Sequence, residues 1–227
     1  MHVALKIYLD TADFAEIAAA GPPVVGFTTN PSLMRAAGVK DYMEFASSVA
    51  HRNISIEVIS DDWPEMERQA RVLSALGGGV YVKIPVVNTR GVSSVPLIER
   101  LVGDGIKMNV TAVMTVQQAR AVQAVMSEEV PAIISVFAGR IADTGRDPRQ
   151  TVRNIAIDSL RTVEVLWASV RSVLDVRAAR DCEADIITLP PALLRKYVAC
   201  KGKDLDAYSR ETVAQFLFDA VASGYSL

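Results

Sequence analysis

Short runs of apolar and β-branched residues recur along the chain, and more polar segments separate them. The runs are Lys6–Thr11, Val24–Asn30, Ile54–Ile59, Val80–Val86, Ile106–Val113, Ala132–Gly139, Val163–Val170 and Ile186–Pro190. Their first residues are 18 to 31 positions apart, which is the length of one strand, one helix and two loops. Several runs are nearly continuous in hydrophobicity, as strands covered on both faces require. The pattern predicts eight parallel strands.

The segments between these runs, and those that close the chain, show the apolar spacing of helices. They are Tyr42–His51, Pro64–Leu76, Ser93–Val102, Val116–Met126, Gln150–Leu160, Val173–Cys182, Ala192–Ala199 and Asp206–Ala222. Eight strand–helix units in about 220 residues are typical of a (β/α)8 barrel, or TIM barrel. We predict an α/β chain with one barrel domain over residues 1–227, in which 206–227 form an additional C-terminal helix. The alternative is an open, doubly wound sheet.

Composition narrows the classes of function. The 227 residues are 50% hydrophobic, which is enough to bury a core of barrel size. Lys+Arg 24 and Asp+Glu 26 give a net charge of −2, with no basic block for nucleic acid and no basic amphipathic stretch for a membrane surface. No signal-peptide pattern is present, and Cys182 and Cys200 do not make a disulfide framework. We expect a cytoplasmic protein without a metal site, because neither histidine has ligand-spaced partners.

Lys83 is the most informative single residue. It interrupts the apolar run Val80–Val86 near the end of a predicted strand. Apolar surroundings disfavour the ammonium form of a lysine, and a neutral amine can attack a carbonyl to form a Schiff base. The alternative is a lysine whose stem covers apolar surface while its head reaches water. By contrast, Lys6 and Lys107 begin their strands at the opposite face, where solvent can reach them.

Polar residues, together with Phe137, lie at the predicted strand ends, where barrels of this class carry their chemistry. Each one alone could be a cap or a loop anchor. Together they supply carboxylates to move protons, hydroxyls and amides for sugar hydroxyls, and arginines whose fork matches phosphate oxygens. The set is Asp10, Thr28, Asn30, Glu57, Lys83, Asn109, Thr111, Ser135, Phe137, Arg140, Ser169 and Arg171. We call it the rim set, and it indicates Schiff-base chemistry on a phosphorylated sugar.

Two details of the rim set bear on roles. Asp10 and Glu57 are two carboxylates near one predicted pocket, so they can divide the acid and base roles. Ser169 and Arg171 lie at a strand-to-helix junction after the seventh strand, where barrels often bind phosphate at a helix N-terminus.

Six motifs run through the chain: Y-L-D-T-A-D at Tyr8–Asp13, G-F-T-T-N-P-S-L at Gly26–Leu33, V-K-I-P-V at Val82–Val86, N-V-T at Asn109–Thr111, S-V-F-A-G-R-I-A-D at Ser135–Asp143 and T-L-P-P-A-L-L at Thr188–Leu194. With them the sequence resembles the short transaldolases, a group that also contains the fructose-6-phosphate aldolases. The match covers nearly the whole chain. Its most specific part is the Thr-Thr-Asn-Pro-Ser string combined with the lysine near a strand end.

The resemblance implies a role for each member of the rim set. Lys83 matches the Schiff-base lysine, and Asp10 matches the carboxylate that handles the hydroxyl proton of the donor sugar. Glu57 and Thr111 match the pair that orients a catalytic water. Thr28, Asn30, Asn109 and Ser135 match residues that contact the sugar. Arg140, Ser169 and Arg171 match the phosphate site. The family uses no metal or organic cofactor.

Two positions favour transfer over simple cleavage. Fructose-6-phosphate aldolases tend to carry Gln where this chain has Glu57, and Tyr where it has Phe137. Glu57 can accept and return a proton, whereas Gln cannot. Phe137 has no hydroxyl that could protonate an enamine and so release dihydroxyacetone. The resemblance therefore implies a transferase of the pentose phosphate pathway, with sedoheptulose 7-phosphate and glyceraldehyde 3-phosphate as the standard substrates. The alternatives are an aldolase that releases free dihydroxyacetone and a non-catalytic sugar-phosphate-binding barrel.

The C-terminal segment Ala207–Leu227 carries four aromatic residues, Tyr208, Phe216, Phe218 and Tyr225. This is more aromatic surface than one terminal helix usually buries on its own barrel. Short members of the family form decamers from two pentameric rings, with terminal helices packed on neighbours. We expect a homo-oligomer of this kind; the alternative is a helix folded back on its own subunit.

Overall fold

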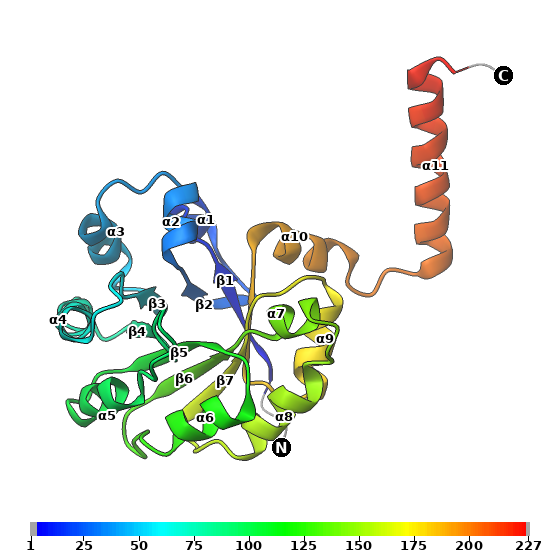
Figure 1. Ribbon diagram of the computed structural model, residues 1–227. Helices are drawn as coiled ribbons and strands as arrows, with labels where there is room; N and C mark the ends of the chain where they lie inside the picture. The colour runs from blue at the N-terminus through cyan, green and yellow to red at the C-terminus, as the bar shows by residue number, and fades with distance from the viewer. Residues whose placement is uncertain (1–3, 226–227) are drawn as a thin grey trace. The chain divides into compact units, whose positions relative to one another are not determined.

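The structure, a computed structural model, describes residues 4–225. Eight parallel strands form a closed barrel in sequence order, which confirms the predicted fold class. The open sheet is excluded because β1 pairs with β8, with Lys6 opposite Ile186. The strands are β1 Lys6–Asp10, β2 Val24–Thr28, β3 Ile54–Glu57, β4 Val80–Pro85, β5 Met108–Val113, β6 Ala132–Val136, β7 Val163–Trp167 and β8 Ile186–Leu189. Figure 1 shows the strands at the centre of the barrel, with helices α1 to α9 (residues 14–181) around them.

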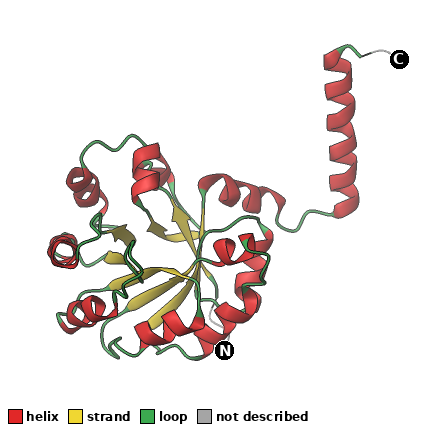
Figure 2. Ribbon diagram, in the orientation of Figure 1, coloured by secondary structure: helices red, strands yellow, loops and turns green. Residues whose placement is uncertain are grey.

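Helices follow the strands along the chain, as Figure 2 shows. They are α1 Phe14–Ala19, α2 Pro31–Ala36, α3 Tyr42–Val49, α4 Trp63–Ser74, α5 Val95–Gly103, α6 Val116–Gln123, α7 Ala138–Asp143, α8 Arg149–Ile157, α9 Leu174–Asp181, α10 Pro191–Cys200 and α11 Leu205–Ser223. The sequence pattern missed α1, α2 and α7, because each has only six residues and so shows too little periodicity. Local capping forms two of them: Asp13 caps α1, and Asn30 caps α2 with a proline at its start.

The sixth predicted strand, Ala132–Gly139, ends earlier than expected. The chain leaves the extended conformation at Phe137, whose φ and ψ are −80° and 63°. Ala138 and Gly139 therefore begin α7 instead of extending β6. This early turn brings Arg140 back over the end of the barrel, where it lines a cavity.

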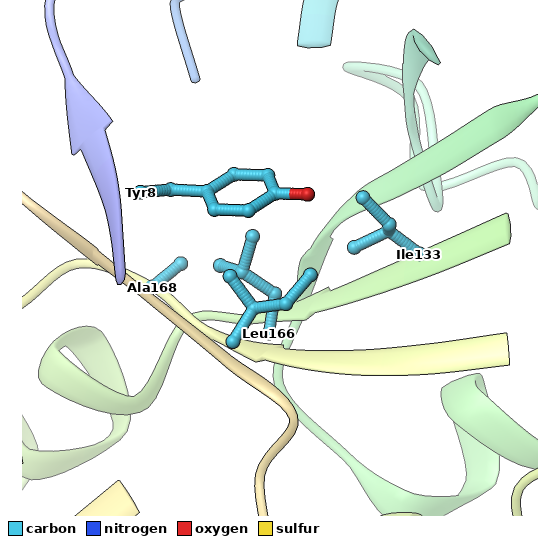
Figure 3. Packing of buried hydrophobic residues seen from close by; sticks show 5 residues of the cluster. Tyr8, Ile133, Leu166 and Ala168 are labelled. Carbon is cyan, nitrogen blue, oxygen red and sulfur yellow. The ribbon is translucent and has the colours of Figure 1, made fainter. Parts of the chain in front are cut away.

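Apolar side chains fill the lower layer of the barrel interior. Tyr8, Ile133, Leu166, Ala168 and Ile186 form one buried cluster, which Figure 3 shows from close by. The Tyr8 hydroxyl accepts a hydrogen bond from the Asn53 amide at 2.8 Å. The barrel is therefore a packed core below its C-terminal rim rather than a channel.

Two compact units make up the chain. The first comprises residues 1–194 and holds the barrel, and the second comprises 195–227. In the second unit, Asp204 caps α11 and Gly224 ends it in the left-handed conformation. Within residues 195–225, large apolar side chains of α11 such as Phe216 and Leu217 are exposed. The described residues do not include 1–3, which belong to the predicted domain, or 226–227, which belong to the predicted extension. No helix within residues 4–225 has the length and hydrophobicity to cross a membrane.

Candidate active site

A cavity of about 220 Å³ lies at the C-terminal rim of the barrel. Ten of the twelve residues in the rim set line it, namely Asp10, Thr28, Asn30, Lys83, Thr111, Ser135, Phe137, Arg140, Ser169 and Arg171. A larger hollow of about 970 Å³ lies at the other end of the strands, beside Leu5, Val163 and Asp185, and contains none of the rim set. The predicted site residues therefore line the smaller cavity and not the larger hollow.

The two-residue period of a strand explains why these side chains meet. Residues two apart on a strand point to the same face, so each polar rim residue lies one layer above an interior residue. Asp10 follows Tyr8 in this way on β1, and Ser135 follows Ile133 on β6. Since Tyr8 and Ile133 belong to the interior cluster, the residue two positions later also faces the inside of the barrel.

Lys83 lies on β4 with only 7% of its side chain exposed. Its amine donates a hydrogen bond to the backbone carbonyl of Thr29 at 2.8 Å and lies 3.1 Å from Oε2 of Glu57. Strand register places this pair, because Glu57 is the direct partner of Lys83 across β3 and β4. The Lys83 amine is thus buried, and it lies beside a carboxylate that can exchange a proton with it.

Tyr42 fixes the end of β3. Its hydroxyl, at the start of α3, donates a hydrogen bond to the backbone carbonyl of Glu57. Burial raises the pKa of Tyr42 and the nearby Glu57 carboxylate raises it further, so this phenol stays a neutral donor. The contact ties the backbone of Glu57 to a helix outside the barrel.

Lys6 and Lys107, which lie at the beginnings of strands, have different surroundings from Lys83. The Lys6 amine pairs with Glu164 at 2.5 Å, and its side chain is 41% exposed. The Lys107 amine donates to the carbonyl of Gly78 at 2.7 Å, in an exposed position. Both lie at the lower end of their strands, so Lys83 is set apart from them as expected.

Asp10 is joined to two hydroxyls at the rim. The Thr28 hydroxyl donates to Oδ1 of Asp10 at 2.6 Å and lies 2.6 Å from the Thr188 hydroxyl. Burial raises the pKa of Asp10, while the Thr28 hydrogen bond and the Lys83 charge oppose this rise. Asp10 is therefore a carboxyl group that can take up a proton more readily than an ordinary aspartate.

Asn109 lies behind the cavity instead of lining it. Its amide group donates to the Ser55 hydroxyl at 2.9 Å, and its carbonyl accepts from the Ser135 hydroxyl at 2.7 Å. Asn109 and Ser55 are both fully buried. This network holds Ser135, which does line the cavity, in a fixed orientation.

Thr111 faces the inside of the barrel two positions after Asn109, and a β-bulge follows it. Ala112 has a left-handed φ of 59°, and the pairing of β5 with β6 shifts between Val110 and Val113. The buried Thr111 hydroxyl has no hydrogen-bond partner among residues 4–225. It is thus free to contact a substrate or a water in the cavity.

Asn30 and Phe137 also have structural tasks. The side-chain oxygen of Asn30 accepts from the Leu33 amide at 2.9 Å as the cap of α2, which leaves only its NH₂ group for a ligand. The Phe137 ring packs against the interior cluster and lines the cavity. Asn30 can therefore donate to a sugar hydroxyl, while Phe137 adds an apolar wall.

Arg140, Ser169 and Arg171 meet where α7 approaches the chain after β7. Ser169 has a left-handed φ of 62°, and its backbone lies so close to Gly139 that a side chain at position 139 would overlap it. Glycine is therefore needed there for close approach rather than for a special backbone angle. The contact fixes the distance between the segment of Arg140 and that of Arg171.

Arg171 is already held by two carboxylates. Its guanidinium forms a fork with Asp143, at 3.2 Å to Oδ1 and 2.5 Å to Oδ2. Asp175 accepts from the backbone amides of Arg171 at 2.7 Å and of Ser172 at 3.2 Å. These amides before α9 are thus occupied, so an anion at this rim would meet the arginine side chains and Ser169 rather than those amides.

Two polar residues at the site were missed in the sequence, besides the apolar lining residues Leu166, Ala168, Val170 and Pro190. Thr188 on β8 lines the cavity, and Ser55 on β3 supports Asn109. Strand period could have found both, because Thr188 lies two positions after the interior residue Ile186 and Ser55 two before Glu57. No group of three or more histidine, cysteine or acidic side chains that could hold a metal occurs in residues 4–225.

Comparison with known proteins agrees with this geometry. A family model described as "Transaldolase/Fructose-6-phosphate aldolase" matches residues 7–224. A probable transaldolase of Hyphomonas neptunium is 32% identical, over 97% of this chain and 99% of that protein. Probable transaldolases of Novosphingobium aromaticivorans and Nitrosopumilus maritimus are each 33% identical; the alignments cover 84% and 85% of this chain, and 88% and 86% of those proteins.

Solved structures resemble the fold alone. A structure described as native KDPGal has a TM-score of 0.52 at 12% identity, over 83% of each chain. A cube-shaped, highly porous protein cage designed by fusing symmetric oligomeric domains has a TM-score of 0.55 at 12% identity, over 98% of this chain and 80% of that one.

Proposed function

The chain belongs to the transaldolase/fructose-6-phosphate aldolase family, and from this premise we propose that it is a transaldolase. It would move a dihydroxyacetone unit from a ketose phosphate to an aldose phosphate through a Schiff base on Lys83. The observation that carries the proposal is the buried Lys83 amine, 3.1 Å from the Glu57 carboxylate and in one cavity with Asp10 and two arginines.

The first half-reaction begins at the amine. Glu57 takes a proton from Lys83, and the neutral amine attacks the ketone carbon of the donor; loss of water then gives an iminium ion. Asp10 accepts the proton of the adjacent hydroxyl as the carbon–carbon bond breaks. The bonding electrons move to the iminium, which becomes an enamine, and the aldose phosphate leaves. The raised pKa of Asp10 suits a group that must hold a proton after cleavage.

The second half-reaction reverses these steps with another aldehyde. The enamine carbon attacks the acceptor carbonyl, Asp10 returns its proton to the new hydroxyl, and water hydrolyses the Schiff base. Glu57 and the unpaired Thr111 hydroxyl are suited to orient that water. Thr28, Asn30 and Ser135 supply polar groups for the sugar hydroxyls.

Phosphate binding by Arg140, Ser169 and Arg171 is part of the proposal. Arginine forks match phosphate oxygens, and Asp143 already orients one of the two guanidinium groups. The substrates would be the phosphorylated sugars of the cytoplasmic pentose phosphate pathway, with sedoheptulose 7-phosphate and fructose 6-phosphate as donors.

Transfer rather than cleavage is supported by Phe137. Its ring lines the cavity and carries no hydroxyl that could protonate the enamine. The three-carbon unit would therefore persist on Lys83 until an acceptor arrives.

A homo-oligomer is also proposed, with α11 at the contact between copies. Phe216, Leu217 and Phe218 point to different sides of this helix, and each is exposed within its own unit. Three large apolar side chains in a row are normally buried, and another copy of the chain could cover them. Light scattering at micromolar concentration tests this proposal, and a monomer would contradict it.

The transferase assay separates the proposal from its alternatives. The protein is incubated with fructose 6-phosphate, with and without erythrose 4-phosphate, and sedoheptulose 7-phosphate and free dihydroxyacetone are measured. We expect sedoheptulose 7-phosphate in the presence of the acceptor and little dihydroxyacetone in its absence. Equally fast release of dihydroxyacetone without acceptor would establish an aldolase. Turnover of neither kind by folded protein would leave only a binding barrel.

A further inference from the structure

Three side chains from neighbouring strands form a short hydrogen-bonded chain at the rim: Asp10 on β1, Thr28 on β2 and Thr188 on β8. Both links measure 2.6 Å, at the short end of the range for hydroxyl hydrogen bonds. Thr28 is 3% exposed and Thr188 is 4% exposed, so water does not compete freely for either hydroxyl. The chain ends on the carboxyl group to which the proposed mechanism assigns proton transfer.

Counting protons fixes the direction of these bonds. A threonine hydroxyl has one proton to donate and can also accept, whereas an ionised carboxylate can only accept. When Asp10 is ionised, the single proton of Thr28 points to it. The contact between Thr28 and Thr188 is then a hydrogen bond only if Thr188 is the donor.

The same chain can run in the opposite direction. When Asp10 carries a proton, the carboxyl group can donate to Thr28, and the Thr28 hydroxyl turns to donate to Thr188. Both short contacts survive in either protonation state, and only two hydroxyl groups rotate. A single threonine beside Asp10 would lose this option, because its proton would have no second acceptor.

We propose that Thr188 is a positioning residue, which sets the direction of the Thr28 hydroxyl and so supports Asp10 in both protonation states. This proposal rests on the assignment of Asp10 as the group that accepts and returns the sugar hydroxyl proton. In the ionised state the chain is charge-assisted, and such bonds are about twice as strong as neutral ones. Thr188 therefore favours the carboxylate form of Asp10, which cleavage requires.

Other groups also act on Asp10 and must be held constant in a test. Thr28 faces it from β2, the Glu57 carboxylate from β3 and the Lys83 ammonium from β4, and the two rim arginines line the same cavity. Thr188 carries no charge and is linked to Asp10 only through Thr28. Replacing Thr188 by valine keeps its branched shape and removes only the hydroxyl, while serine keeps the hydroxyl and removes a methyl group.

The test compares Thr188→Val and Thr188→Ser in the transferase assay, from about pH 5 to pH 9. We expect kcat of the valine variant to fall by about fivefold to tenfold with KM little changed. The acidic limb of its kcat profile should move to higher pH, because the carboxylate form of Asp10 loses support. Serine should restore both the rate and the profile. Serine as damaging as valine, or a wild-type pH profile in the valine variant, would overturn the proposal.

A second measurement does not depend on activity. The loss of thermal stability in Thr188→Val should be larger at neutral pH, where the chain is charge-assisted, than under acidic conditions, where Asp10 is protonated. A loss that is independent of pH would mean that Thr188 only packs. If the wild type shows no transfer at all, the proposed function fails, and the stability comparison still decides whether Thr188 supports the Asp10 carboxylate.

Discussion

Replacing Gly139 by alanine should damage the phosphate site and leave the Schiff-base lysine intact. The added Cβ would overlap the Ser169 carbonyl oxygen and lie 2.8 Å from its carbonyl carbon. Ordinary contact begins at 3.4 Å, so the carbon must retreat by about 0.6 Å, and the oxygen by more. The neighbour is backbone in a left-handed conformation and cannot simply change rotamer.

The size of the effect follows from this displacement. Overpacking of this kind typically costs about 1–3 kcal/mol of stability. A shift approaching 1 Å in a positioning group can cost up to about a hundredfold in rate. We expect kcat/KM for fructose 6-phosphate to fall by about tenfold to a hundredfold, mostly through KM.

Steady-state kinetics and covalent trapping separate the two sites. Gly103→Ala is the matched control, because Gly103 ends α5 with open space around it and should behave as wild type. Borohydride trapping of Gly139→Ala with unphosphorylated dihydroxyacetone should remain normal, since Lys83 lies on a different strand. A folded Gly139→Ala protein with wild-type KM for fructose 6-phosphate would refute the assignment of the phosphate site to the Ser169 segment.

Three other changes test separate parts of the account. Phe137→Tyr should raise the release of free dihydroxyacetone without acceptor, because a phenol can protonate the enamine; an unchanged ratio of release to transfer would count against this reasoning. Arg140→Ala and Arg171→Ala should each weaken use of phosphorylated sugars by about tenfold to a hundredfold, and equal losses for unphosphorylated analogues would contradict a phosphate role. Asp10→Asn should abolish transfer but raise the melting temperature at pH 7, because burial raises the pKa of Asp10 and makes its ionisation costly. This gain in melting temperature should shrink below about pH 4, where the wild-type carboxyl group is protonated in both the folded and the unfolded state. A gain that persists at low pH would show that ionisation is not its cause.

Sequence pattern predicted the barrel well, because its signals are long and regular. Each of the eight predicted runs contains the observed strand, and the register of β3 with β4 then brings Glu57 beside Lys83. The short helix α7 was not predicted, because six residues give little periodicity, and its close approach to Ser169 at Gly139 is a tertiary contact. This contact joins segments thirty residues apart, so the sequence around either segment does not reveal it.

The sequence identified most of the polar residues that line the rim cavity, but not the contacts between them. Two-residue alternation identifies which side chains face the interior, and it would have added Thr188 to the rim set. It does not reveal that Asp143 holds Arg171, or that Asn109 orients Ser135. Those features depend on tertiary contacts, which hydrophobic patterning does not encode.

Covalent trapping of the native protein tests the central claim most directly. The protein is incubated with fructose 6-phosphate, reduced with borohydride, digested and mapped by mass spectrometry. We predict a reduced sugar adduct on Lys83, and its loss in a folded Lys83→Met variant. An adduct on Lys6 or Lys107, or trapping that persists in Lys83→Met, would contradict the account.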